Sequence, residues 1–148
     1  MGNAFNAMAG ILAAAIFTLI AAIHAYWALG GLWPGHDPDS LARIVVGGQP
    51  GMRMPGVVAT WTVVGVLTGA ALTVLGASGI IVLPMTQSLL RLAAYAGAGV
   101  LLLRGLEGFV DTRIRPTTVG SPFARLNVRF YSPLCLMLAG LTYAAAAL

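Results

Sequence analysis

Long runs of apolar residues alternate with short polar segments along the whole chain. The apolar runs cover about 5–32, 55–76, 87–110 and 130–148. Each run is close to or longer than the roughly 20 residues that a helix needs to cross the hydrocarbon core of a bilayer. The pattern therefore predicts an all-α integral membrane protein, a four-transmembrane-helix bundle in which residues 1–148 form a single transmembrane domain.

The first polar segment and the end of the second apolar run contain helix-breaking residues. Residues 34–40 are rich in proline, glycine and aspartate, which predicts a loop. Ser40 is placed to cap a short helix over 41–46. The second apolar run either ends at the small residues 76–79 or continues as a helix to Leu83.

The second polar segment leads into the last apolar run, and it is predicted to be a loop over 111–121. Ser121 and Pro122 then have the order of an N-cap and a first helical residue, so a short interfacial helix is predicted before the last span. Pro133 predicts a kink where this helix meets the span. The alternative is a three-span protein whose last segment inserts only halfway. It is disfavoured because no charged residue follows Arg129.

The composition favours lipid as the solvent of this chain. Charged residues make up 8% and hydrophobic residues 59%, with a mean hydropathy of +0.90. A soluble domain of average composition is about 25% charged. The first apolar run lacks a basic n-region and is too long for a signal peptide, so it is predicted to be a retained span. Cys135 is the only cysteine, which excludes an internal disulfide.

The charges are distributed unevenly between the two sides of the predicted membrane. The net charge is +4, and all eight basic residues are arginines. One side carries Arg43, Arg53, Arg104, Arg113, Arg115, Arg125 and Arg129, and the other carries only Arg91. The positive-inside rule therefore places the arginine-rich side in the cytoplasm and both termini outside it. Contacts with anionic lipids explain these arginines better than nucleic acid does, because no soluble domain carries a basic patch.

Ionisable residues inside the predicted spans gather near the cytoplasmic side. His24 lies about two turns before the polar end of the first span. Arg104, Glu107 and Asp111 follow one another at i, i+3 and i+7, which places them on one face near the end of the third span. The last span begins on the same side, with Arg129 and Tyr131. Ionisable groups in a membrane are costly, so they mark candidate functional residues.

One interpretation is a polar cavity that is open to the cytoplasmic leaflet. His24 and Glu107 would form its catalytic acid–base pair, because histidine titrates near neutral pH and burial raises the pKa of a carboxylate. The ligand-binding candidates are Trp27, Arg104, Asp111, Arg129 and Tyr131. Arg104 could hold an anionic headgroup or a carbonyl. The other interpretation is a closed network, in which Arg104 pairs with Glu107 and His24 hydrogen-bonds to one of them without any chemistry.

Haem and metal sites are not expected from this sequence. A haem held between two spans would usually need two facing histidines, and the second histidine, His36, is in a loop. A zinc site needs three or four ligands, and no ligand-spacing motif is present. Small residues at i and i+4, such as Gly65 with Gly69 and Ala9 with Ala13, predict close helix packing within the chain or in a homodimer.

Two segments resemble a known family. They are 24–31, His-Ala-Tyr-Trp-Ala-Leu-Gly-Gly, and 123–135, Phe-Ala-Arg-Leu-Asn-Val-Arg-Phe-Tyr-Ser-Pro-Leu-Cys. With the arginine and acidic residue that end the third span, they resemble the small bacterial membrane proteins grouped as domain of unknown function 3995. In that pattern an acidic residue often stands at the position of Asn127. Its third span ends Arg-x-x-Gly-Asp-Phe, whereas residues 104–109 here are Arg-Gly-Leu-Glu-Gly-Phe. The resemblance covers the whole chain and implies a bacterial four-span protein without a particular activity.

The leading functional hypothesis is binding of a lipid-like or isoprenoid/quinone-like molecule in the polar cavity. Proton transfer by His24 and Glu107 is an extension of it. The alternative is an accessory or structural subunit of a larger membrane complex, which the glycine and alanine faces and the small extramembrane area favour. A small transporter is a weaker third hypothesis, because the paired broken helices of such proteins are missing, although Pro133 could create one break.

Overall fold

The computed structural model describes residues 2–47, 54–115 and 119–147, which contain helices and connecting turns and no strand. The helical elements are α1 (Gly2–Ala28), α2 (Pro38–Val45), α3 (Val57–Ala77), α4 (Gln87–Ile114), α5 (Pro122–Leu126), the π-helical turn η1 (Asn127–Tyr131) and α6 (Ser132–Ala146). Three helical segments are long and apolar enough to cross a membrane: Ala4–Ala28, Val57–Ala77 and Gln87–Ile114. These are the features of a multi-pass membrane protein. The path α5–η1–α6 adds a further long helix beside α4.

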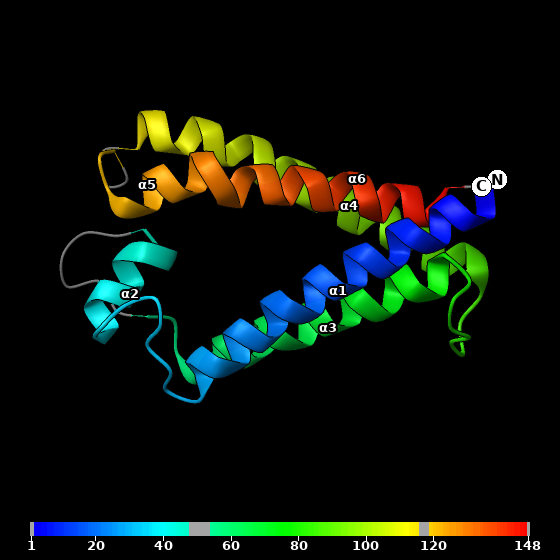
Figure 1. Cartoon of the computed structure of the whole chain (residues 1–148), viewed down its shortest axis with the longest axis horizontal. Coiled ribbons are helices and arrows are strands. Elements are labelled where there is room, and N and C mark those ends of the chain that lie inside the picture. Colours follow the sequence, from blue (N-terminus) through cyan, green and yellow to red (C-terminus); the bar gives the residue numbers. More distant parts are fainter. Residues whose placement is uncertain (1, 48–53, 116–118, 148) are drawn as a thin grey trace.

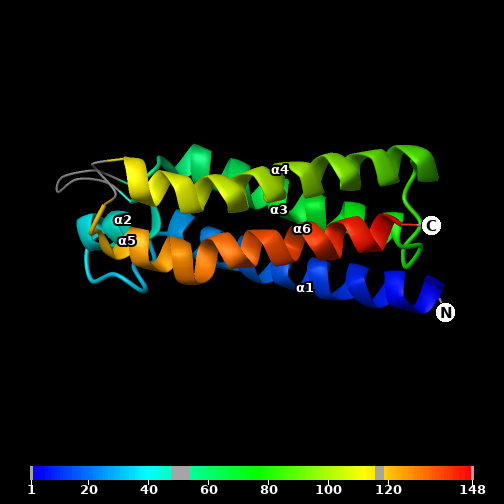
Figure 2. The same ribbon diagram turned by 90° about the horizontal axis from the view of Figure 1, so that it is seen from above.

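The long helices form two pairs that spread apart at one end (Figure 1). Helix α1 packs along α3, and α4 packs along α6. The two pairs lie close together where both termini lie, and they diverge toward the end that carries α2 and α5 (Figure 1). Figure 2 shows the same helices from above, with α2 and α5 at one end of the long axis and the termini at the other. The molecule therefore has a closed end and an open end.

The hydrophobic core fills the closed end. Fully buried residues at its centre include Ala13 of α1, Val74 of α3 and Leu138 of α6. The core residues nearest the open end are Ile20, Leu67, Leu101 and Leu134 on the four long helices. Among the described residues, neither hydrophobic core cluster continues past this layer. Helix α1 runs on for about 12 Å beyond it, and its residues there belong to neither core cluster.

Helix α1 ends earlier than the apolar pattern predicts. The apolar run extends to Leu32, but the helix stops at Ala28. The backbone N–H of Gly31 donates to the carbonyl of Tyr26 at 2.9 Å, and that of Gly30 donates to the carbonyl of Trp27 at 3.0 Å. Gly30 has a φ of +93°. This is a Schellman motif, in which the glycine adopts the left-handed conformation that satisfies the last carbonyls of the helix.

The cap of α2 also differs from the prediction. The N-cap is Asp37 rather than Ser40, and Pro38 occupies the first helical position. The Asp37 carboxylate accepts the Ser40 N–H at 2.7 Å, and the Ser40 hydroxyl accepts the Asp37 N–H at 3.0 Å. Ser40 is thus the third residue of a reciprocal capping box. The helix ends before Gly47, whose φ is +77°.

The Asp37 cap makes the order of α2 sensitive to acid. The hydrogen bond from the Ser40 backbone N–H holds the pKa of Asp37 below its ordinary value of 3.8. Because the pKa is lowered in the folded state, the capping contribution is complete above the unfolded pKa and is lost as the pH falls through the folded pKa. We therefore expect Asp37→Ala to lower the protection of α2 amides against hydrogen exchange at neutral pH. Below the lowered pKa of Asp37, the variant and the parent should be equally protected. Equal protection of the two proteins at neutral pH would contradict this assignment.

The remaining helix ends test the other boundary predictions. Helix α3 ends at Ala77, the earlier of the two predicted ends, where Gly79 has a φ of +76°. Helix α4 continues to Ile114, so the predicted loop over 111–121 is wrong for its first four residues. Ser121 is the N-cap of α5, as predicted, and its hydroxyl accepts the Ala124 N–H at 3.0 Å.

The predicted pairs of small residues lie on two different surfaces, one in the core and one on the outside of the helices. Ala9 and Ala13 of α1 are buried in the core, which confirms close packing within the chain at that pair. Gly65 and Gly69 of α3 have open space at the Cβ position, with no atom of the described chain within 4 Å. The Gly65–Gly69 pair therefore lies on the outer face of α3 and does not pack within the chain.

Candidate functional site

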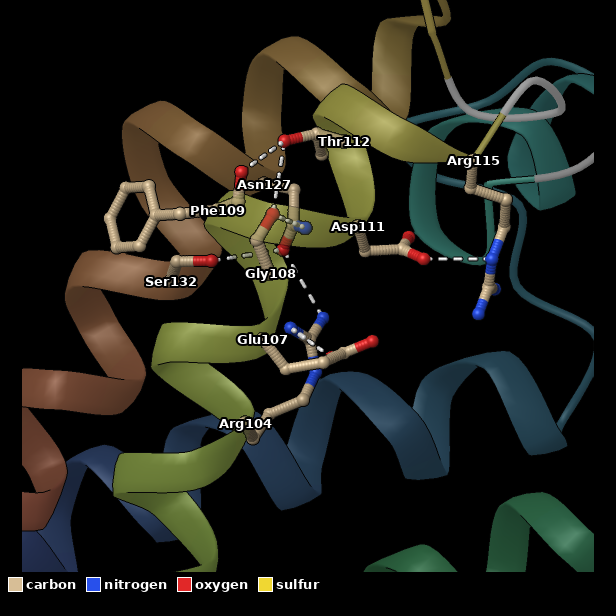
Figure 3. A network of polar contacts seen from close by, with 9 residues as sticks. All are labelled: Arg104, Glu107, Gly108, Phe109, Asp111, Thr112, Arg115, Asn127 and Ser132. Carbon is tan, nitrogen blue, oxygen red and sulfur yellow. Dashed lines mark hydrogen bonds and ion pairs between the residues drawn. The ribbon is translucent and has the colours of Figure 1, made fainter.

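The polar residues that end α4 line a pocket at the open end of the molecule (Figure 3). Its volume is about 200 Å³. The lining residues come from the end of α2, from α4 and from α5–η1, and they are Val46, Arg104, Glu107, Asp111, Arg115, Phe123 and Asn127. The four ionisable residues continue one face of α4 at i, i+3, i+7 and i+11. Two arginines and two carboxylates therefore share a small, largely polar space.

Asn127 joins this face of α4 to the last helix. Its side chain is 1% exposed and stands at the first position of η1. The amide Nδ2 donates to the Gly108 carbonyl at 3.0 Å, while Oδ1 accepts from Arg104 Nη2 at 3.2 Å. A flipped amide would place two donors against each other at Arg104 and two acceptors at Gly108, so both bonds fix its orientation. Asn127 thereby holds the guanidinium of Arg104 beside the pocket (Figure 3).

Glycine at position 108 lets the two helices approach closely enough for this network. A Cβ at this position would overlap the Ser132 hydroxyl and lie 2.7 Å from Arg104 Nη1 and 2.9 Å from Asn127 Nδ2. The Gly108 carbonyl also accepts the Thr112 hydroxyl at 3.0 Å. Ser132, which is 0% exposed, donates its hydroxyl to Asn127 Oδ1 at 3.4 Å. The contact between α4 and η1 is therefore polar and tightly packed.

The π-helical turn η1 positions Asn127 and Tyr131. Within it the N–H of Ser132 donates to the Asn127 carbonyl, five residues back instead of four. Pro133 has no N–H, so it cannot donate to the Arg129 carbonyl as a regular helix residue would. The kink that the sequence predicts at Pro133 thus takes the form of a widened turn in a continuous helical path.

The two ion pairs of the pocket differ in strength. Asp111 Oδ1 lies 2.7 Å from Arg115 Nε, and the Asp111 side chain is 12% exposed. Glu107 Oε2 lies 3.6 Å from Arg104 Nη1, and the Glu107 side chain is 56% exposed. The second separation is too long for a hydrogen bond, and Nη1 is buried with no acceptor among the described residues. Of the two arginines in the pocket, Arg104 therefore has the charge that is less completely compensated by a carboxylate.

His24 is not part of this pocket lining. Its Nδ1 lies 2.8 Å from the Ile20 carbonyl, one turn back on α1, and its ring packs edge-on against Trp27 with centroids 4.9 Å apart. Trp27 Nε1 donates to the Trp33 carbonyl at 2.7 Å. The alternative interpretation, a closed network, places a hydrogen bond between His24 and Arg104 or Glu107, and the described residues show none. The predicted Arg104–Glu107 pair is present, although it is long.

Tyr131 and Arg129 lie outside the pocket lining as well. The Tyr131 hydroxyl lies 3.5 Å from the Ile44 carbonyl of α2, and its ring packs against Phe123 with centroids 5.9 Å apart. Tyr131 therefore tethers α2 to the last helix across the open end. Arg129 is exposed on η1. Of the predicted site residues, the structure brings Arg104, Glu107 and Asp111 together in one pocket.

A second, open hollow lies at the end of α1. Its volume is about 430 Å³, and Ala22, Ile23, Tyr26 and Trp33 line it. These side chains are mainly apolar and aromatic. Tyr26 and Trp33 thus lie at this hollow, whereas Tyr131 contacts α2.

Sequence reasoning missed four lining residues: Val46, Arg115, Phe123 and Asn127. Arg115 could have been found by continuing the α4 face one turn past Asp111. Asn127 had only a family-pattern signal, since its position often holds an acidic residue. Among the described residues, no three histidine, cysteine, aspartate or glutamate side chains gather in a way that could hold a metal ion.

Comparison with known proteins gives the chain a family. Residues 17–142 match the family described as Protein of unknown function (DUF3995). The chain belongs to this family. The matched region of the DUF3995 chain contains every residue that lines the polar pocket, together with His24 and the π-helical turn. No curated protein and no solved structure matches the chain.

Proposed function

We propose that this protein binds a lipid-like or isoprenoid/quinone-like molecule between its two helix pairs, with the polar end of that molecule in the pocket beside Arg104. One observation carries the proposal. The hydrophobic core stops at Ile20 and Leu134, and the diverging half beyond it holds a pocket with four ionisable side chains. Ionisable groups at membrane depth favour a functional role.

The size of the pocket favours an elongated ligand. Sites for whole drug-sized molecules occupy roughly 300–1,000 Å³, whereas this pocket measures about 200 Å³. It has room for a polar head and not for an attached chain. An apolar chain would find suitable surroundings where the two helix pairs diverge and face lipid.

The proposal includes a four-span topology. The path from Pro122 to Ala146 runs beside α4 along most of its length, as a fourth span would (Figure 2). Arg43, Arg113 and Arg125 all lie on elements at the open end. This segregation supports a cytoplasmic open end with both termini on the opposite side of a bacterial inner membrane. Catalytic turnover by His24 and Glu107 stays a prediction, and no described contact joins the two residues.

The test is mass spectrometry of small molecules extracted from the full chain purified in mild detergent. Parent protein is compared with Arg104→Gln/Glu107→Gln, and Arg113→Gln serves as the control because Arg113 is exposed outside the pocket. We expect a defined amphipathic species at near-stoichiometric level in the parent and the control. It should be reduced about tenfold or more in the pocket variant, since losing a charged hydrogen bond costs roughly 1.5–3 kcal/mol. Bulk phospholipid alone in all three samples would refute ligand binding.

A second candidate, an accessory or structural subunit, is favoured by the outer face of α3. Gly65 and Gly69 leave open space there, and small residues at this spacing permit close approach of another helix. The same purification discriminates between the candidates. Stoichiometric co-purification of another membrane protein, with bulk phospholipid only, would support the subunit role. A lone monomer or homodimer would count against it.

A further inference from the structure

We propose that the polar end of the ligand is an anion, a phosphate or carboxylate, received by Arg104 in place of Glu107. This inference rests on the proposed function and narrows its ligand class. The pocket contains two arginines and two carboxylates. They differ in how strongly each is held by its partner, and therefore in how readily each can contact a ligand.

Asp111 and Arg115 are already committed to each other. Their atoms are 2.7 Å apart, and the Asp111 side chain is only 12% exposed. Breaking such a charge-assisted contact would leave a largely buried carboxylate without its cation, which is costly. Displacing Asp111 from Arg115 would therefore cost a ligand more than displacing Glu107 from Arg104.

Arg104 is held differently. A guanidinium has five N–H donors, and the hydrogen bond found for Arg104 goes to the neutral Asn127 amide at 3.2 Å. The nearest carboxylate atom in an ion pair is Glu107 Oε2, at 3.6 Å from Nη1. Glu107 is more than half exposed, so it can rotate away into solvent at small cost. Arg104 thus combines a fixed orientation with an unsatisfied demand for acceptor oxygens.

The charges around the pocket favour an anion over a cation. Residues 104–131 contain five arginines and two carboxylates. Arg113, Arg125 and Arg129 are all exposed at this end of the molecule. Their summed field raises the local concentration of anions and lowers that of cations. A planar guanidinium also matches the paired oxygens of phosphate and carboxylate groups.

The experiment uses the full chain in a nonionic detergent and measures binding of four probes by titration calorimetry. They are dodecyl phosphate, dodecanol, dodecyltrimethylammonium and inorganic phosphate. The proteins are the parent, Arg104→Gln and Arg113→Gln, and both variants remove one positive charge. We expect dodecyl phosphate to bind the parent most tightly. Its affinity should fall about tenfold or more in Arg104→Gln and much less in Arg113→Gln, which removes the same charge from the surrounding field without removing a contact.

Glu107→Gln keeps the proposal testable if Arg104→Gln does not fold. Glu107 is exposed, so this variant is expected to fold normally. Removing a competing exposed carboxylate should tighten dodecyl phosphate binding by about 1.4- to 5-fold, the range that corresponds to exposed ion pairs. Weaker or unchanged binding of dodecyl phosphate to Glu107→Gln would overturn the displacement of Glu107.

The probes distinguish failure of the anion site from failure of the proposed ligand binding. Equal binding of dodecanol and dodecyl phosphate, with equal loss in Arg104→Gln, would overturn the anion and leave the proposed function intact. Failure of every dodecyl probe to distinguish the parent from Arg104→Gln would overturn both. If inorganic phosphate bound as tightly as dodecyl phosphate, it would support the anion site and assign it to a soluble ion, contrary to the proposed function.

Discussion

Replacing Gly108 by alanine is expected to destabilise the protein by about 1–3 kcal/mol, the usual cost of overpacking a close contact. The added methyl group would overlap the Ser132 hydroxyl and lie 2.7 Å from Arg104 Nη1. Ser132 is fully buried, and moving its hydroxyl would break its hydrogen bond to Asn127 Oδ1. The free energy of unfolding can be measured by denaturant titration of the detergent-solubilised parent and variant.

Gly99→Ala is the matched control on the same helix. A Cβ at Gly99 has no atom of the described chain within 4 Å. Alanine there removes the helix penalty of glycine, which is roughly 0.5–1 kcal/mol, so this variant should be as stable as the parent or slightly more stable. If Gly108→Ala behaved like Gly99→Ala, the close contact between α4 and η1 would be wrong.

Replacing Asn127 by alanine is the second change with a large expected effect, a loss of about 1–3 kcal/mol. The variant removes the acceptor of Arg104 Nη2 and one donor to the Gly108 carbonyl. Thr112 still donates to that carbonyl, so most of the cost comes from Arg104, from the buried Ser132 hydroxyl that also loses its acceptor, and from the space left behind. The same denaturant titration measures it.

Arg125→Ala provides the comparison, because Arg125 is exposed on the adjacent turn of α5. Exposed substitutions away from special features usually change stability by less than about 0.5 kcal/mol. If Asn127→Ala were as stable as Arg125→Ala, the assignment of Asn127 as the structural link between α4 and η1 would be wrong. Asn127→Asp retains an acceptor for Arg104, so it should lose less stability than Asn127→Ala.

The helices could be predicted from the sequence because each long apolar run is a local property of the chain. Their ends were harder to predict. The end of α1 depends on the left-handed conformation of Gly30, not on the apolar residues that continue to Leu32. The start of α2 depends on which of two capping residues, Asp37 or Ser40, adopts extended backbone. Both choices rest on local hydrogen bonds, and the apolar pattern does not distinguish between neighbouring residues that are each able to cap the helix.

The candidate site was predictable only within one helix. Arg104, Glu107 and Asp111 share a face of α4 by periodicity alone, and the structure places all three in one pocket. The relation of His24 to this face depends on how far the two helix pairs diverge, which no spacing within the chain reveals. Asn127 was missed because a single asparagine among arginines looks like a solvated position, although it is nearly fully buried.

The π-helical turn also affects how later changes to this chain would be tolerated. A π turn contains one residue more than the α-helical turn it replaces, and one residue corresponds to about 100° of rotation. Asn127 and Phe123 therefore stand out of phase with Leu134 and Leu138, which face the core. The extra residue of the π turn lets the pocket residues and the core residues point in directions that a regular helix would not combine. Deleting a single residue between Val128 and Tyr131 would rotate the pocket residues of α5 and η1 by about 100° relative to α6, while leaving the packing of α6 in place.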